Sequence, residues 1–119
     1  MANGALFIGW GGPVRGREAK SLEVFNEGMQ YWTRLRQTGQ IESFEPVALE
    51  PHGGDLFGFV LIRGDRDKLN QLRYSEEWIR LNDRAAAVVD GFGLVTAFVG
   101  EDLQRLFANY QTNTSDLTA

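Results

Sequence analysis

The sequence predicts one α+β domain built on a four-stranded antiparallel sheet, and three observations lead to this prediction. Four short apolar runs are bounded by turn residues, which is the pattern of buried strands. Two longer segments between them carry apolar residues at helical spacing. The order along the chain is strand, helix, strand, strand, helix, strand, and a length of 119 residues fits one domain.

The strands are expected at residues 5–10, 41–49, 56–62 and 94–99. The run at 56–62 contains six apolar residues and one glycine, so we place it inside the sheet. Pro46 cannot donate a ladder hydrogen bond, which puts the second strand at an edge. Right-handed crossovers give the strand order 4-1-3-2, which also places the second strand at an edge. This is the ferredoxin-like arrangement.

The helices are expected at residues 17–38 and from residue 66 to about residue 90, with a break at Tyr74 and Ser75. Gly39 is placed to end the first helix, and Ser75 to cap the second part of the other. Gly28 inside the first helix costs ~1 kcal/mol relative to alanine. The sheet-facing stripe of the first helix is predicted to be Leu22, Phe25, Met29, Trp32 and Leu35, and that of the second Trp78, Leu81, Ala85 and Val88. A short helix around residues 103–110 completes a domain of residues 1–110, and 111–119 are expected to form a flexible tail.

The apolar pattern of the strands predicts that two copies of the chain associate. Two helices cover one face of a four-stranded sheet, yet the first, third and fourth strands are apolar on both faces. An exposed apolar face of that size marks an interface. The simplest cover is the same sheet of another chain related by a two-fold axis, so we expect a sheet-to-sheet homodimer.

Composition excludes several classes of function. A net charge of −4 argues against nucleic-acid binding, and the absence of cysteine excludes disulfides and thiolate metal sites. With a single histidine, we expect no metal and no cofactor. We find no signal peptide and no apolar stretch of membrane-spanning length, and therefore expect a cytoplasmic protein with no membrane partner.

The chain resembles the dimeric α/β-barrel proteins over residues 5–100. The resemblance rests on the element order, on the corners at Gly39 and Gly53-Gly54, and on the start of the second helix, Tyr74-Ser75-Glu76-Glu77-Trp78. This group includes antibiotic-biosynthesis monooxygenases, haem-degrading monooxygenases and YCII-related proteins, and the chain looks most similar to small uncharacterised bacterial members. The resemblance implies paired ferredoxin-like subunits with a ligand cavity between helices and sheet. The haem-degrading pattern fails, because no histidine lies in residues 66–90.

We expect the catalytic or ligand-binding site at one edge of the sheet, where the topology brings together residues 10–17, 51–55 and 90–93. His52 has the intrinsic pKa of a general acid–base, with Asp55 or Asp90 to orient it. The alternative is a solvated hairpin histidine. Asp55 is the second catalytic candidate.

Four further residues are candidates for ligand binding. The glycine-rich loop carrying Arg15 and Arg17 precedes a helix and suits an anion, or is simply a flexible connection. The dinucleotide and phosphate-loop fingerprints both fail there. Trp10 and Phe59 are candidate walls of the cavity, as are Phe25 and Trp32.

Two main functions follow from this reading. The first is a cofactor-independent monooxygenase- or isomerase-like enzyme acting on a small aromatic or polyketide-like compound, which the resemblance implies. The second is a non-catalytic module that binds or senses a small molecule, including an anion. A dimeric interaction domain without a ligand is a third alternative.

Overall fold

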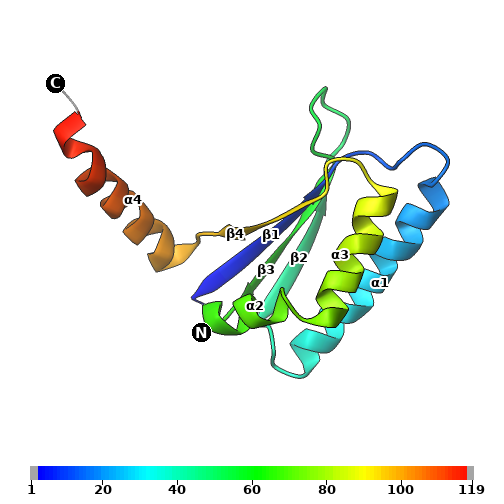
Figure 1. Cartoon of the computed structure of the whole chain (residues 1–119), viewed down its shortest axis with the longest axis horizontal. Helices are drawn as coiled ribbons and strands as arrows, with labels where there is room; N and C mark the ends of the chain where they lie inside the picture. Colours follow the sequence, from blue (N-terminus) through cyan, green and yellow to red (C-terminus); the bar gives the residue numbers. More distant parts are fainter. Residues whose placement is uncertain (1–2, 118–119) are drawn as a thin grey trace.

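The computed structural model describes residues 3–117 as a four-stranded sheet with helices on one face (Figure 1). The elements follow the chain as β1 (Gly4–Trp10), α1 (Glu18–Gln37), β2 (Ser43–Ala48), β3 (Gly58–Gly64), α2 (Arg66–Leu72), α3 (Glu76–Val88), β4 (Gly93–Ala97), α4 (Gly100–Thr114) and the 3₁₀ turn η1 (Ser115–Leu117). The expected order of strands and helices is therefore confirmed.

The strand order in the sheet is β2-β3-β1-β4, which is the predicted order 4-1-3-2 read from the other edge. All three pairings are antiparallel. Pro46 lies in the edge strand β2, opposite Val60, where its missing N–H disturbs no interior ladder. The helices α1 and α3 lie side by side over one face, and the opposite face has no helix packed on it within residues 3–117 (Figure 1).

The core lies between the sheet and these two helices. Leu6 and Ile8 of β1 stand opposite Ile62 and Val60 of β3, and all four are buried. From the helical side Trp78 is fully buried. It meets the Tyr31 ring edge-on at 5.7 Å between centroids, and this burial raises the pKa of the Tyr31 hydroxyl above its ordinary value. Packing in the core therefore accounts for Trp78 on this face of the helix, and no catalytic role is needed to explain it.

The buried stripe of α1 differs from the expected one. Leu22 is 67% exposed, and the buried positions are Val24, Gly28, Tyr31, Trp32 and Leu35. The two stripes are neighbours on the helix surface and share Trp32 and Leu35. Hydropathy favours Met29 over Gly28 and Tyr31, but the contact with Trp78 draws Tyr31 into the core. Helix α1 is therefore turned slightly from the predicted orientation.

The helix ends follow the sequence signals. Gly39 has φ +77°, the left-handed conformation that glycine adopts most easily after a helix, and its N–H donates to the Arg36 carbonyl. Ser75 occupies the N-cap position of α3, as predicted, and separates it from α2, but its hydroxyl donates to the Leu72 carbonyl at 2.7 Å and makes no capping hydrogen bond to α3. Glu77 in the first turn of α3 forms an ion pair with Arg34 of α1.

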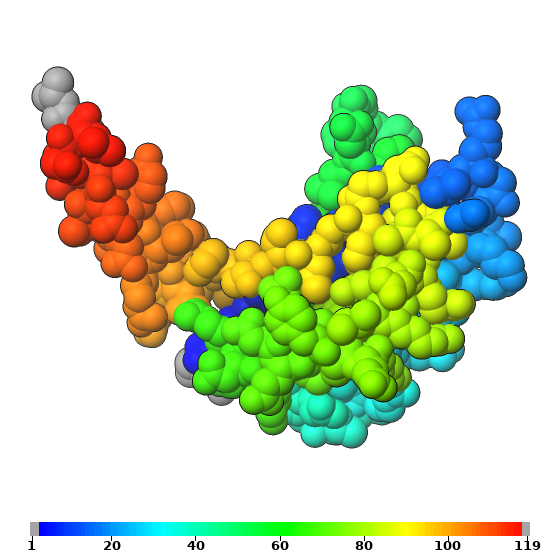
Figure 2. Space-filling view, viewed as in Figure 1, coloured from blue at the N-terminus to red at the C-terminus, as the bar shows by residue number. Residues whose placement is uncertain are grey.

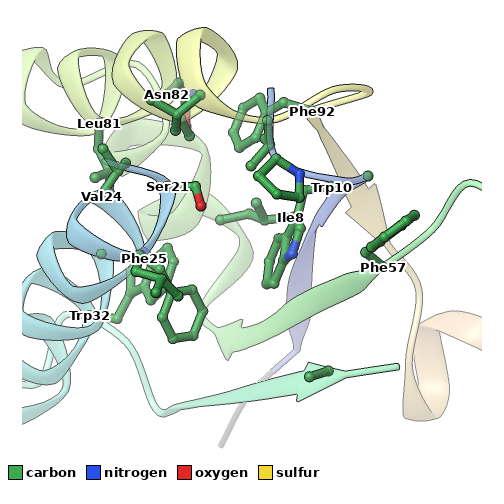
Figure 3. Close-up of a pocket in the computed structure, with 18 residues that line it drawn as sticks. Ile8, Trp10, Ser21, Val24, Phe25, Trp32, Phe57, Leu81, Asn82 and Phe92 are labelled. Carbon is green, nitrogen blue, oxygen red and sulfur yellow. The ribbon is translucent and has the colours of Figure 1, made fainter. Parts of the chain in front are cut away.

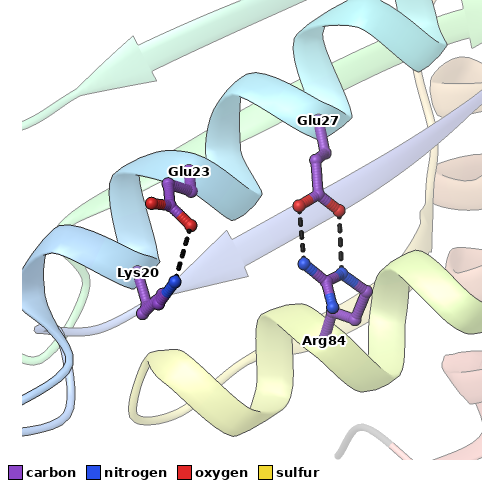
Figure 4. A network of polar contacts seen from close by, with 4 residues as sticks. All are labelled: Lys20, Glu23, Glu27 and Arg84. Carbon is purple, nitrogen blue, oxygen red and sulfur yellow. Dashed lines mark hydrogen bonds and ion pairs between the residues drawn. The ribbon is translucent and has the colours of Figure 1, made fainter.

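A second ion pair ties α1 to α3 near the middle of both helices. Arg84 Nε donates to Glu27 Oε1 at 2.8 Å and Nη2 to Oε2 at 2.6 Å, a two-pronged contact, while Lys20 and Glu23 pair along α1 (Figure 4). The hydrogen bonds from Arg84 lower the pKa of Glu27. The two helices are thus held in register over the sheet.

The face of the sheet away from α1 and α3 is apolar over most of β1, β3 and β4, as expected, and Glu45 forms an ion pair with Arg63 on this face toward the β2 edge. Phe7 and Phe59 stack with their centroids 5.2 Å apart, and Val95 beside Phe7 is 55% exposed. Leu61 lies on the same face. Helix α4 then leads away from the domain (Figures 1 and 2) and extends beyond the short helix expected at 103–110. Nothing in residues 111–117 resembles a glycine or proline stop, which explains its greater length.

Candidate functional site

A cavity of about 350 Å³ lies between α1, α3 and the sheet. Figure 3 shows side chains of both helices and of β1 lining it. Aromatic rings form much of the wall: Trp10, Phe25, Trp32, Phe57 and Phe92. The remaining wall is mostly aliphatic, including Ile8 of β1 and Leu81 of α3. A cavity of this size and composition suits a small, largely apolar molecule.

Two glycines make room for the tryptophans of the wall. A Cβ on Gly58 would lie 2.7 Å from Cζ2 of Trp10, so only glycine lets the indole lie across β3. A Cβ on Gly28 would lie 2.8 Å from Cη2 of Trp32. Phe25 meets Trp10 edge-on at 5.8 Å between centroids and joins the two sides of the wall. The shape of the cavity thus depends on two pairs of residues, each made of one glycine and one tryptophan.

Few polar groups reach the cavity. Ser21 of α1 lines it, and its hydroxyl donates to the Glu18 carbonyl at 2.6 Å. Asn82 of α3 also lines it, and its amide has no hydrogen-bond partner among residues 3–117. The indole N–H of Trp32 also lacks a partner within this range, but it is buried out of reach of a water-sized molecule. The Asn82 amide is therefore available to hydrogen-bond a ligand.

No ionisable side chain lines the cavity within the described part of the chain. A charge developing against this wall would have no counter-ion, and a charged ligand would lose part of its hydration without compensation. The geometry therefore favours an uncharged ligand held by shape and by a few hydrogen bonds.

Of the predicted wall residues, Trp10, Phe25 and Trp32 line the cavity. Phe59 lies on the opposite face of the sheet, stacked on Phe7. The reason is register: Phe59 pairs with Gly9, and both point away from the helices, whereas Trp10 and Val60 point toward them. Phe59 belongs to the apolar outer face and is not a wall of the cavity.

The predicted edge cluster forms, but its two catalytic candidates lie outside the cavity. The Gly11 N–H donates to the Asp90 carbonyl at 2.6 Å, and the Phe57 N–H donates to the Trp10 carbonyl at 2.8 Å, which joins three loops. His52 and Asp55 are exposed in the hairpin between β2 and β3. The His52 ring Nδ1 lies 3.1 Å from the Glu50 carbonyl. Their catalytic roles stay predictions.

The two arginines also lie outside the cavity wall. Arg17 donates to the Ala87 carbonyl of α3 at 2.5 Å, which fastens the start of α1 to α3. Arg15 is exposed. Residues 3–117 contain no cluster of three or more His, Cys, Asp or Glu side chains that would hold a metal ion. No helix of this part of the chain is both long and apolar enough to cross a membrane.

Sequence reasoning missed Asn82, placed Phe57 inside the strand expected at 56–62, and included Phe92 only as part of the 90–93 segment, without a role in the wall. Asn82 lies four residues after Trp78 and three before Ala85, so it is a polar residue within the apolar stripe of its helix. This polar interruption of the apolar stripe was the sequence signal that could have identified Asn82 as a cavity residue. Phe57 and Phe92 lie in loops, where hydrophobic periodicity indicates nothing about orientation.

Solved structures resemble this chain in fold. One is a dimeric protein of unknown function with a ferredoxin-like fold from Bacteroides fragilis, with TM-score 0.58, 13% identity, and coverage of 82% of this chain and 97% of that one. The fold is ferredoxin-like. Another is SnoaB, a cofactor-independent oxygenase from Streptomyces nogalater, with TM-score 0.51, 18% identity, and coverage of 83% and 97%. A point mutant of SnoaB gives TM-score 0.56 at 19% identity.

No protein-family model matches the chain, and no curated protein matches it. The structural likenesses confirm the ferredoxin-like fold that the resemblance to dimeric α/β-barrel proteins implies. At these identities the likeness concerns the fold alone.

Proposed function

We propose that the cavity binds an uncharged aromatic compound and that the protein promotes its reaction with dioxygen without a cofactor. The observation that carries this proposal is the wall itself, which is rich in aromatic rings and to which the described residues contribute no ionisable side chain. A cavity of ~150 Å³ admits benzene, so about 350 Å³ accommodates roughly two to three fused rings. The likeness in fold to a cofactor-independent oxygenase supports the same reading.

Asn82 is the proposed hydrogen-bonding residue. Its amide offers both a donor and an acceptor. A ligand carbonyl or phenolic oxygen beside it would satisfy an amide that has no hydrogen-bond partner among residues 3–117. Stacking on Trp10 and Phe25 would hold the rings in the plane that these contacts require.

The reaction proposed is oxidation of a CH₂ group next to the aromatic rings to a carbonyl. The carbon loses two hydrogens and gains one oxygen atom of O₂, and the second oxygen atom leaves with those hydrogens as water. The substrate supplies all four electrons, so no external reductant enters. The Asn82 amide would hydrogen-bond the oxyanion that forms when water takes up the CH₂ proton.

The same fold supports the proposal of a homodimer. Phe7, Phe59, Leu61 and Val95 form an apolar outer face on the sheet. A surface of this kind is typical of an interface. The protein from Bacteroides fragilis with this fold is dimeric. We place the two-fold contact on this face.

Non-catalytic binding of the same compound is the second candidate. It is favoured by the lack of any acid or base in the wall, because proton removal then has no obvious acceptor there. An isomerase needs the same proton transfer. The two candidates share the cavity and differ only in whether the bound compound reacts.

Anthrone and anthraquinone test both candidates. Anthrone has three fused rings and a CH₂ opposite a carbonyl, and oxidation converts it to anthraquinone. We expect the protein to bind both compounds, to quench the fluorescence of its tryptophans, and to accelerate oxygen uptake by anthrone in an oxygen electrode. Binding without faster oxygen uptake would support the non-catalytic candidate. Absence of binding would remove both.

Matched variants locate the site. Asn82→Leu keeps the branched shape of the side chain and removes the amide, so we expect about tenfold weaker binding. Asn70→Leu makes the same change on the exposed surface of α2 and should leave binding unchanged. His52→Ala separates the hairpin from the cavity: lost turnover with intact binding would assign catalysis to His52, and intact turnover would remove it from the mechanism.

A further inference from the structure

Helix α4 presents an apolar stripe with no other surface of residues 3–117 beneath it. Leu103, Leu106, Phe107 and Tyr110 recur at helical spacing, and Phe107 and Tyr110 are 62% and 67% exposed. Every residue from 103 to 113 is exposed. Figures 1 and 2 show the helix standing away from the sheet, with a wide hollow between the two.

The direction of α4 is fixed at its first turn. Asp102 is buried and forms an ion pair with Arg66 of α2, and Arg105 approaches its other oxygen at 3.5 Å. A carboxylate in the first turn also suits the helix dipole. The helix is therefore anchored to the domain at one end while its apolar stripe projects beyond it.

A helix in this position needs a partner. An isolated helix of about 15 residues is marginal in water even with favourable residues, and α4 contains two asparagines and two threonines. Burial of its apolar stripe supplies the missing stabilisation. Within residues 3–117 no element of the same chain offers that burial.

We infer that α4 packs across a second copy of this chain and forms an essential part of the dimer interface. The inference rests on the proposed homodimer and adds its second component. The outer sheet face and the α4 stripe are both apolar, both without cover, and adjacent along the chain through β4. A two-fold axis through the sheet contact brings each helix to the other protomer.

The area of the sheet face supports this inference. Four strands about 4.8 Å apart and roughly 20 Å long present only ~400 Å². A stable dimer buries ~800 Å² on each partner. A helix of 15 residues is ~22 Å long and ~10 Å wide, and thus covers ~200 Å². Each protomer contributes its own helix and the surface under its partner's helix, which adds ~400 Å² and brings the interface to the usual size.

Sedimentation velocity over a range of protein concentrations tests the inference with charge-matched variants. Leu106→Glu and Phe107→Glu place a carboxylate on the stripe, and each should weaken dimerisation at least about tenfold. Ala108→Glu and Thr112→Glu add the same charge to the opposite side of α4 and should leave it unchanged. All four sites are exposed in the protomer, so a lower unfolding temperature is expected for the two stripe variants alone, as a consequence of weaker dimerisation.

Val95→Glu on the outer sheet face distinguishes the proposed sheet-to-sheet contact from the proposed role of α4 in the interface. If Val95→Glu dissociates the dimer and the stripe variants do not, the sheet contact stands and the role of α4 is refuted. If the wild-type protein is monomeric at every concentration, both are refuted.

A label on the helix identifies what covers it. The chain has no cysteine, so bimane attaches to Leu103→Cys alone. We expect a blue shift of its emission that grows with protein concentration and has the same midpoint as dimerisation. A blue shift that does not depend on concentration would show α4 folded onto its own chain and would overturn the inference.

Discussion

Replacing Gly28 with alanine separates the helical role of this residue from its role in the cavity wall. In an ordinary helix interior the change stabilises by ~1 kcal/mol. Here the new Cβ would lie 2.8 Å from Cη2 and 3.0 Å from Cζ3 of Trp32, well inside the ~3.5–4.0 Å of a normal carbon contact. Trp32 is buried, so its ring must shift, and overpacking of this kind costs ~1–3 kcal/mol. We therefore expect Gly28→Ala to destabilise by up to about 2 kcal/mol.

The same substitution in a Trp32→Leu background provides the control. With the indole removed, the clash is gone and Gly28→Ala should stabilise by ~1 kcal/mol, the helix preference alone. Urea unfolding followed by far-UV circular dichroism, at one fixed protein concentration, measures all four members of the cycle. Equal stabilisation by ~1 kcal/mol in both backgrounds would refute the view that Gly28 is there to admit Trp32.

Three further predictions concern single contacts. Glu27→Gln removes a carboxylate whose pKa Arg84 lowers, so wild type should lose its advantage in thermal stability as the pH falls below about 4.3, and an advantage unchanged at pH 3 would contradict this. Burial raises the pKa of Tyr31, which favours the folded state only while the hydroxyl stays neutral, so wild type should lose stability in urea above about pH 10 and Tyr31→Phe should not. Gly58→Ala forces the new Cβ to 2.7 Å from Trp10 Cζ2 and 2.9 Å from the Val47 carbonyl oxygen, and should lower the unfolding free energy by about 1–3 kcal/mol and weaken anthraquinone binding. Unchanged binding would remove Trp10 from the site.

The fold was predictable because its determinants are local or topological. The apolar runs of the strands, the glycine after α1 and the cap at Ser75 are signals within a few residues of each element. Crossover handedness then leaves few arrangements of four strands. Pro46 provided an independent check, since it must lie at an edge.

The cavity was not predictable in the same way because it depends on pairs distant in sequence. That Trp10 lies across Gly58 is set by strand register, which no periodicity reports. The side on which Phe59 lies changes with a shift of one residue in that register. Hydropathy treats Asn82 as a defect in an apolar stripe, although it supplies the free amide of the cavity. The projection of α4 likewise follows from one contact, between Asp102 and Arg66, across 36 positions of chain.

A wall without ionisable groups makes one more prediction, about the ligand itself. A phenol that binds as the neutral molecule must lose water and gain no counter-ion if it ionises inside the cavity, so binding raises its pKa. The affinity for 1-naphthol should therefore fall as the pH rises through the pKa of free naphthol, while the affinity for anthraquinone, which has no proton to lose, stays level over the same range. Fluorescence titration at several pH values measures both. A naphthol affinity that rises with pH would mean that a cation contacts the bound ligand. Arg15 and Arg17, which lie outside the cavity wall in this structure, would then be the candidates for that cation.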